Sequence, residues 1–280
     1  MELNITNSDI CRVCPSGTTP DMDLVDSLGR FFSDAASSLV PLVGRALLES
    51  VAASSSLADT ATDLRERLWQ WCMCYIIAKG YHDAIPHLDL VLTPTGFGVV
   101  SNQNVAPASS DRVERLRAVL SRQSDFYFVE ILSLLRSIPE WHEFKSSYRI
   151  TSFFWDYRNL KLLGVPDPCL DDMASHLADI SAGEAMCRQL LGREFWGELL
   201  SAEAHDTLTD AQAAVVRLIR NFVAAAVDGG PRLEMHRKVL LDYIHHDIHL
   251  FKTYEDSSAC AANTFRLYEN GKDDSCFFFG

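Results

Sequence analysis

The sequence predicts a mainly α-helical protein, made of one or more helical bundles with one protruding β-hairpin or extended loop and an extended C-terminal tail. Three observations lead to this fold class. Apolar residues recur at helical spacing along most of the 280-residue chain, one short segment is instead rich in β-branched residues around a turn, and breakers rich in Gly and Pro separate the periodic runs. Because 48% of the residues are apolar and 22% are charged, the chain can bury a large core.

The order of breakers and periodic runs divides the chain into four parts. Polar and turn-forming residues fill 1–22, which we expect to be an irregular N-terminal arm. A helical domain over 23–163, with a hairpin at about 88–109, is followed by a second helical region over 164–254 and a tail over 255–280. The boundary between the two helical parts is placed at the strongest breaker, Gly164-Val-Pro-Asp-Pro.

The clearest helical period of the first domain lies between residues 60 and 79, where Leu64, Leu68 and Trp71 recur on one face. Gly80 and Pro86 are expected to end this helix. The other helices expected in this domain are a run from Asp23 that Pro41 interrupts or kinks, a run over 42–52, a helix that begins at Ser109 or Ser110, and helices at 124–137 and 139–162.

The segment from Leu88 to Val100 differs from its surroundings, because β-branched residues flank the turn Pro94-Thr-Gly. This pattern predicts a hairpin, continued by an extended loop to about residue 109. We expect Thr93, Pro94 and Phe97, which lie at the turn, to contact a partner.

Four further helices are expected in the second region, near 168–181, 182–201, 208–227 and 231–254. Gly229-Gly-Pro separates the last two.

Charge is unevenly distributed along the chain, whose formal net charge is −13. Residues 167–215 hold ten acidic residues against two arginines. By contrast, the segment 111–122 carries Arg112, Arg115, Arg117 and Arg122 against two acids. Surfaces of opposite sign on one chain suit head-to-tail self-association into a ring, although the acidic segment taken alone is equally typical of a solvated face.

The C-terminal tail ends in three consecutive aromatic residues, Phe277, Phe278 and Phe279, after a polar turn. Left free, they would expose a large apolar patch. The tail therefore either folds back onto its own chain or docks into a partner as an extended strand.

Composition excludes several classes of protein. No apolar run reaches the length of a membrane span, the first residues lack the pattern of a secretory signal, and the acidic balance disfavours general binding to nucleic acid. We therefore expect a cytoplasmic chain whose eight cysteines are mostly buried free thiols. No catalytic, cofactor-binding or metal-ligating residue is expected.

The alternative of another class is a metal-dependent hydrolase that uses His245 and His249. On one helix these residues lie one turn apart, a spacing that can bind zinc, with Asp242 or His246 as a further ligand. An exposed polar helix face is the interpretation that we prefer, because no separate motif presents a third ligand. A third option is a protein that binds one host partner through the aromatic residues at 141–155, which are more simply interpreted as core.

One block of the sequence resembles a known signature. Ala84-Ile-Pro-His-Leu-Asp-Leu-Val-Leu-Thr-Pro-Thr-Gly-Phe-Gly-Val-Val-Ser-Asn-Gln-Asn-Val-Ala-Pro-Ala-Ser, followed by Arg112-Val-Glu-Arg-Leu, resembles an uncharacterised protein family of bacteriophages and prophages in gut bacteria. The helices before the hairpin and the apolar end of the tail are also similar to head–tail connector (adaptor) proteins of tailed phages.

The resemblance implies a structural virion protein that has no catalytic residues. It would assemble with itself as a ring of about 12 subunits, bind the portal protein and tail or neck proteins, and passively line a DNA channel without reading sequence. Its location would be the neck of the virion, assembled in the host cytoplasm. The hairpin, the pair Arg112 and Arg115, and the three terminal phenylalanines would be the contacts. A tail terminator or another neck or ring protein is the alternative within this class.

Overall fold

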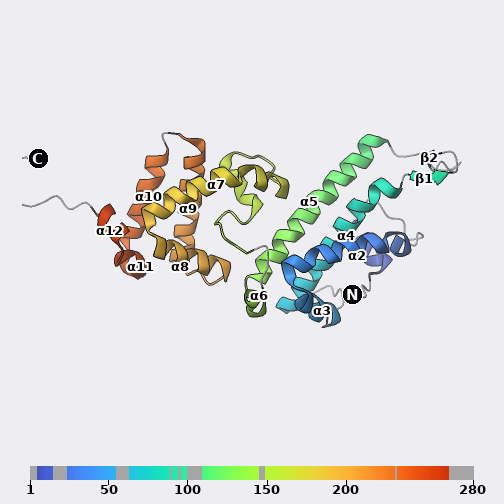
Figure 1. Ribbon diagram of the computed structural model, residues 1–280, viewed down its shortest axis with the longest axis horizontal. Coiled ribbons are helices and arrows are strands. Elements are labelled where there is room, and N and C mark those ends of the chain that lie inside the picture. Colours follow the sequence, from blue (N-terminus) through green and yellow to red (C-terminus); the bar gives the residue numbers. More distant parts are fainter. Residues whose placement is uncertain are drawn as a thin grey trace, which may run out of the picture. The chain divides into compact units, whose positions relative to one another are not determined.

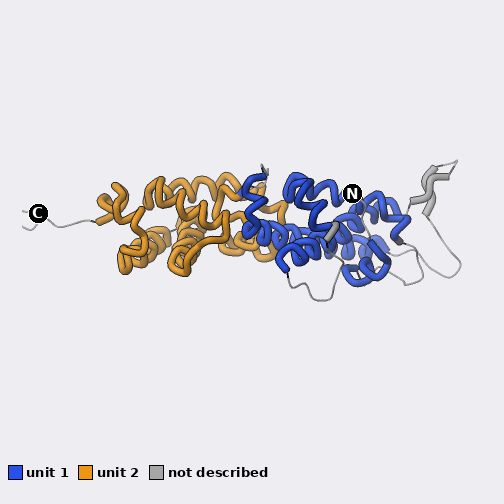
Figure 2. The backbone as a smooth tube through the Cα atoms, turned by 90° about the horizontal axis from the view of Figure 1, so that it is seen from below, with its two compact units in different colours: residues 1–149 blue, residues 150–280 orange. Residues whose placement is uncertain are grey.

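The computed structural model describes residues 5–14, 24–54, 63–88, 90–93, 96–99, 109–144, 149–230 and 232–264. The chain divides into two compact units, residues 1–149 and 150–280, coloured separately in Figure 2. Helices make up most of the described residues of both units, as Figure 1 shows, which confirms the mainly α-helical fold class. Within these described ranges, no helix combines the length and the hydropathy that a membrane crossing requires.

The first unit is organised around one long buried helix, α4, against which α1, α2, α3 and α5 pack. Its elements are α1 (Asn7–Val13), α2 (Leu24–Val43), α3 (Arg45–Ser54), α4 (Leu64–Leu88), β1 (Leu90–Thr93), β2 (Gly96–Val99), α5 (Ser110–Leu135) and α6 (Pro139–Glu143). The core side chains of α4 include Leu68, Cys72 and Ile76, all fully buried, as the helical period predicts.

Helix α4 continues through Gly80 and Pro86, so the prediction that these residues end it is wrong. Gly80 permits the close approach of α2. A Cβ atom at this position would lie 2.6 Å from the Phe32 ring and 3.1 Å from the Phe31 carbonyl oxygen. Pro86 lies in the last turn of the helix, where its missing N–H removes one helical hydrogen bond.

Helix α2 likewise continues through Pro41, where the sequence predicts an interruption or a kink. The helix ends instead just before Gly44. Gly44 has a φ of 87°, a left-handed conformation that glycine adopts without strain. Its N–H donates to the Val40 carbonyl, and its own carbonyl accepts from Leu48 N–H, so α2 ends and α3 begins at one residue.

Strands β1 and β2 pair antiparallel, with Leu90 opposite Val99 and Thr93 opposite Gly96. Two four-residue strands contribute little to a fold made of helices. The predicted protruding hairpin with its extended loop has no support beyond this short pairing, because residues 94–95 and 100–108 lie outside the described residues.

The N-terminal arm contains a helix that the prediction for 1–22 lacks. The Thr6 hydroxyl accepts from Asp9 N–H and the Asp9 carboxylate accepts from Thr6 N–H, a reciprocal cap that starts α1. Ile10 and Val13 are then buried, and α1 packs on α4.

The second unit is a helical bundle in which α9 packs against α7, α10 and η1. Its elements are η1 (Tyr157–Leu163), α7 (Leu170–Leu191), α8 (Arg193–Ala204), α9 (Asp210–Asp228), α10 (Leu233–His246), η2 (Ile248–Leu250), α11 (Lys252–Glu255) and α12 (Ser258–Asn263). The division between the units falls between Arg149 and Ile150, before the breaker at Gly164 where the sequence places it.

Three predicted helices differ from the structure. The described residues of the run 139–162 contain only α6 and the 3-10 helix η1, because backbone and side-chain hydrogen bonds hold residues 152–155 in a non-helical conformation. The break expected at residue 181 falls at Gly192, whose φ is 85°. The helix expected over 231–254 ends at His246, where the chain turns and places Phe251 and Tyr254 against Phe195 of α8.

The aromatic residues after residue 140 mostly fill the cores, as the simpler interpretation predicts. Trp141, Phe153 and Phe154 are buried, and the Trp141 indole N–H donates to the Leu42 carbonyl at 2.7 Å. Tyr148 lies outside the described residues. The predicted tail over 255–280 begins with a packed element, since α12 contacts α7 and the Asn263 amide donates to the Leu190 carbonyl. Residues 265–280 lie outside the described residues.

Substituting Gly80 with Ala tests the close approach of α2 and α4. The added methyl group would displace the Phe32 ring, and we expect a loss of about 1–3 kcal/mol in the free energy of unfolding, measured by urea denaturation. A Cβ atom added at Gly29 in α2 would have nothing within 4 Å, so Gly29→Ala is the matched control and should stabilise by about 0.5–1 kcal/mol. A Gly80→Ala protein as stable as the wild type would contradict this explanation.

Candidate assembly surfaces

The arginines of α5 lie on an exposed face at its N-terminal half. Arg112 and Arg115 are exposed, and Arg117 lies 3.9 Å from Glu114 of the same helix. Positive charge in the first turns of a helix opposes its dipole, so helix stability gives no reason for these arginines.

Apolar residues share this face with the arginines. Val119 and Phe126 are 51% and 37% exposed, and the Phe126 ring also contacts the Trp71 ring of α4. Helical periodicity places them beside Arg112 and Arg115. We call this set the α5 face: Arg112, Arg115, Val119, Arg122 and Phe126. Arginine interleaved with exposed apolar and aromatic groups is the composition that protein interfaces favour.

The acidic segment of the second unit is only partly a surface. Asp171, Asp179, Glu194, Glu198, Asp206 and Asp210 are exposed, from α7 to the start of α9. Glu184 and Glu203, which the sequence groups with them, are buried and 8% and 5% exposed. The exposed acids therefore still form a negative surface, but a weaker one than the sequence predicts.

The two buried carboxylates hold a structural network. Glu203 accepts from the Arg220 guanidinium at 2.8 Å and from the Trp155 indole N–H at 2.6 Å. Glu184 accepts from the Ser152 hydroxyl and from the Phe153 backbone N–H, both at 2.8 Å. Buried charges persist only when they are paired and hydrogen-bonded, and these partners tie residues 152–155 to α7, α8 and α9.

The structure separates the two histidines of the hydrolase alternative. Helix α10 ends at His246, so the prediction that His245 and His249 lie one turn apart on one helix is wrong. His249 Nδ1 lies 3.0 Å from Glu255, whereas His245 Nε2 lies 3.4 Å from the Tyr254 hydroxyl. Among the described residues, no three His, Cys, Asp or Glu side chains are grouped so that they could hold a metal ion.

Several cysteines of the first unit are buried. Burial raises the pKa of the Cys14 thiol to about 12, with a smaller contribution from Cys74, and burial raises the pKa of Cys74 to about 11. Cys72 is fully buried and its pKa is raised for the same reason. These thiols stay protonated at neutral pH, which agrees with their interpretation as small apolar groups and not as nucleophiles.

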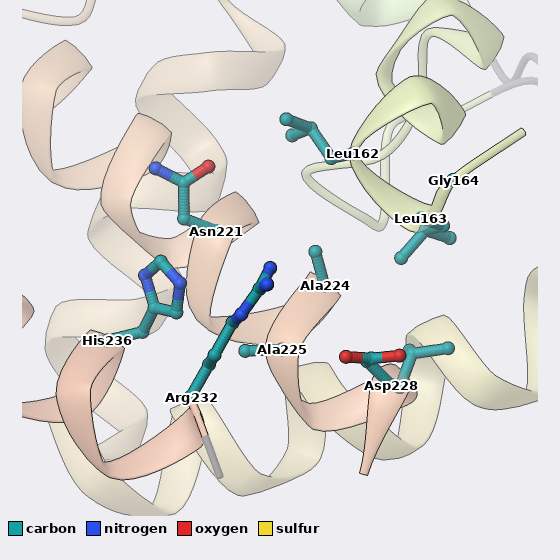
Figure 3. Close-up of a pocket in the computed structure, with 10 residues that line it drawn as sticks. Leu162, Leu163, Gly164, Asn221, Ala224, Ala225, Asp228, Arg232 and His236 are labelled. Atoms are coloured by element: carbon teal, nitrogen blue, oxygen red, sulfur yellow. The ribbon is translucent and has the colours of Figure 1, made fainter. Parts of the chain in front are cut away.

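A cavity of about 450 Å³ lies in the second unit between η1, α9 and α10. In Figure 3, Arg232, His236 and Asn221 lie on one side of it and Leu162 and Leu163 on the other. The wall therefore combines a cation, an imidazole and an amide with apolar groups. No sequence motif indicates this cavity, because it depends on the packing of the η1 segment against α9.

The structure places the predicted contact residues in different ways. Arg112 and Arg115 come together on the α5 face. Thr93 is the last residue of β1 and Phe97 is the second residue of β2. Residues 94–95, which connect the two strands, lie outside the described residues. Pro94 and the three phenylalanines 277–279 also lie outside the described residues. Sequence reasoning missed Val119 and Phe126, which a helical wheel over residues 110–126 would have placed beside the arginines.

Comparison with protein families gives a match to part of the first unit. Residues 39–149 match the model of a family of unknown function (DUF6712). The match ends at Arg149, where the first compact unit also ends, and it includes the α5 face. Neither the curated proteins nor the solved structures contain a match to this chain.

The buried carboxylate of Glu184 makes the stability of the second unit depend on pH. Burial is the largest influence on its pKa and raises it above the ordinary value of 4.5, against the hydrogen bonds from Ser152 and Phe153. A raised pKa in the folded state favours the protonated form there. The contribution of protonated Glu184 to the free energy of unfolding is therefore complete below pH 4.5. It is lost as the pH rises through the raised pKa of the folded state.

Glu184→Gln removes this dependence, because a Gln side-chain oxygen can still accept from Ser152 and Phe153. We expect the free energy of unfolding of the variant, relative to the wild type, to increase between about pH 4 and pH 8 in urea denaturation. Glu184→Ala is the control: it lacks the same titrating group, so its stability changes with pH as that of the Gln variant does, but it leaves the buried Phe153 N–H without its acceptor and should be about 1–3 kcal/mol less stable than Glu184→Gln at every pH. A difference between the Gln variant and wild type that does not change with pH would contradict the assignment.

Proposed function

We propose that this chain is a structural virion protein, a head–tail connector (adaptor) subunit that joins portal to tail through assembly into a ring. The observation that carries the proposal is the α5 face, where Arg112 and Arg115 stand exposed beside Val119 and Phe126. This face is suited to contact with a protein and offers no arrangement for chemistry.

The second unit supplies a surface of complementary charge. Exposed acids of α7, α8 and the start of α9, such as Asp179 and Glu194, face solvent. In a ring each subunit contacts two neighbours through two different surfaces, so a positive surface on one unit and a negative surface on the other suit a head-to-tail contact. Electrostatic complementarity would set the orientation, while Val119 and Phe126 would contribute the buried apolar area.

The resemblance of the Leu88–Leu116 block adds the virion context. The block runs from the end of α4 through the two strands to the arginines of α5, and all of it falls inside residues 39–149. The α5 face would be one half of the subunit contact, and the segment around Thr93 and Phe97 would be placed to reach the portal protein or a tail or neck protein.

Charge reversal on the α5 face tests the proposal. Wild-type protein should form rings in negative-stain images, alone or with portal protein, and sedimentation should show a concentration-dependent oligomer that weakens in high salt. Arg112→Glu combined with Arg115→Glu should raise the concentration needed for assembly by at least about tenfold, because like charges across an interface cost several kcal/mol.

The matched control is Arg30→Glu combined with Arg45→Glu, which changes the net charge equally on side chains that are 88% and 73% exposed in the same unit. This variant should assemble like the wild type. A strict monomer in light scattering, even with portal protein present, would overturn the proposal.

A further inference from the structure

Helix α10 presents a row of exposed apolar side chains. It buries Leu240 and Ile244 on one side. On another side, Met235, Val239 and Tyr243 recur every four residues and are 53%, 45% and 39% exposed. We call these three residues the α10 strip. A surface helix normally carries polar residues on this side, and a continuous apolar row at this spacing is the pattern that receives a peptide.

The α10 strip continues into the cavity beside η1. Arg232 and His236 line that cavity, and helical periodicity places both within about 60° of Val239 around the helix axis. Leu162, on the opposite wall, is 46% exposed. The combined surface is thus cationic at one end and apolar along the rest of α10, so it fits a peptide in which acidic residues are followed by aromatic ones.

The chain itself contains such a peptide. Residues 265–280 include Asp273 and Asp274, followed after two residues by Phe277, Phe278 and Phe279. The described part of the chain leads directly to this segment from α12. Asn263, at the end of α12, lines a small pocket together with Lys238 and His245 of α10, so the segment begins next to this helix.

We propose that the α10 strip and its cavity bind residues 265–280 of the same chain. Asp273 contacts Arg232, and Phe277 and Phe279 pack on Val239 and Tyr243. The inference does not depend on the function proposed above, because a chain with any role would need to cover both apolar groups.

The spacing of the two sets of residues agrees. A helix rises about 1.5 Å per residue, so Val239 and Tyr243 lie about 10 and 16 Å along the axis from Arg232. An extended chain advances about 3.3 Å per residue, so Phe277 and Phe279 would lie about 10 and 16 Å from Asp274. Alternate residues of an extended segment point the same way, so Asp273, Ser275, Phe277 and Phe279 can face α10 together.

The segment is long enough to bind within its own chain. The ten residues from Thr264 to Asp274 can span about 33 Å when extended, whereas the 14 residues of α10 are about 21 Å long. Asn270-Gly271 favours the reversal of direction that this path requires. A short tether gives an effective concentration in the millimolar range, which favours binding to the same chain over binding to a second copy.

A disulfide between residues 235 and 275 provides the test. With Asp274 at the level of Arg232, Ser275 would lie about 3 Å along α10, close to the level of Met235, and on the same side of the segment as Phe277 and Phe279. Full-length protein carrying Met235→Cys, Ser275→Cys and Cys276→Ser, oxidised with glutathione disulfide, should form a disulfide between residues 235 and 275, detected by peptide mass spectrometry. The control replaces Met235→Cys by Arg237→Cys, an exposed position at almost the same height on another side of the helix, where the disulfide should form at least about tenfold more slowly.

Two further measurements separate the proposal from its competitors. In a mixture of ¹⁴N- and ¹⁵N-labelled protein carrying Met235→Cys, Ser275→Cys and Cys276→Ser, the linked peptides should carry the same isotope. Adding Phe277→Ala and Phe279→Ala, at positions outside the described residues, should slow the cross-link at 235 to the rate of the control. Equal rates at 235 and 237, links between different isotopes, a disulfide joining residues 235 of two copies, or indifference to the phenylalanines would each overturn the proposal.

Discussion

The need to neutralise carboxylates inside the second unit determines much of its arrangement. Glu184 and Glu203 are buried, and the groups that satisfy them come from residues 152–155 and from Arg220 of α9. This requirement keeps residues 152–155 out of a helix and attaches them to the bundle. Because η1 follows immediately, the same hydrogen bonds also determine where Leu162 and Leu163 meet α9, and hence the position of the cavity.

The two surfaces to which we assign binding share one physical design. The α5 face, and the α10 strip together with its cavity, each combine arginine with exposed apolar side chains, although the chain as a whole has a net charge of −13. In an acidic protein, a few exposed cations attract acidic groups of a partner segment without raising affinity for phosphate backbones. The apolar residues beside them supply the area that charge alone cannot provide.

Local signals in the sequence were sufficient for helices whose ends are capped by their own residues. Helix α9 closely follows its predicted range of 208–227, because Thr209 and Gln212 cap its start and Gly229 adopts a left-handed conformation after its end. Gly80 could not be interpreted in this way. Whether a glycine ends a helix or admits a neighbour depends on Phe32, which is distant in sequence.

The candidate sites show the same difference between local signals and contacts that are distant in sequence. Arg112 and Arg115 could be found from the sequence, because a run of arginines in the first turns of a helix is visible there. The cavity at Arg232 and His236 could not, since its walls come from η1, α9 and α10. His249 shows the opposite error: a pattern that suits one helix loses its meaning where the chain turns to bury Phe251.

The burial of Cys14 allows the opening of helix α1 to be followed through a natural thiol. Cys14 is 3% exposed and burial raises its pKa to about 12, so we expect an alkylating reagent to react with it mainly when α1 separates from α4. The rate of alkylation at Cys14 therefore reports how often the first helix opens in the folded protein. Docking of α1 thus becomes a local equilibrium that can be followed in any preparation or assembly of the chain.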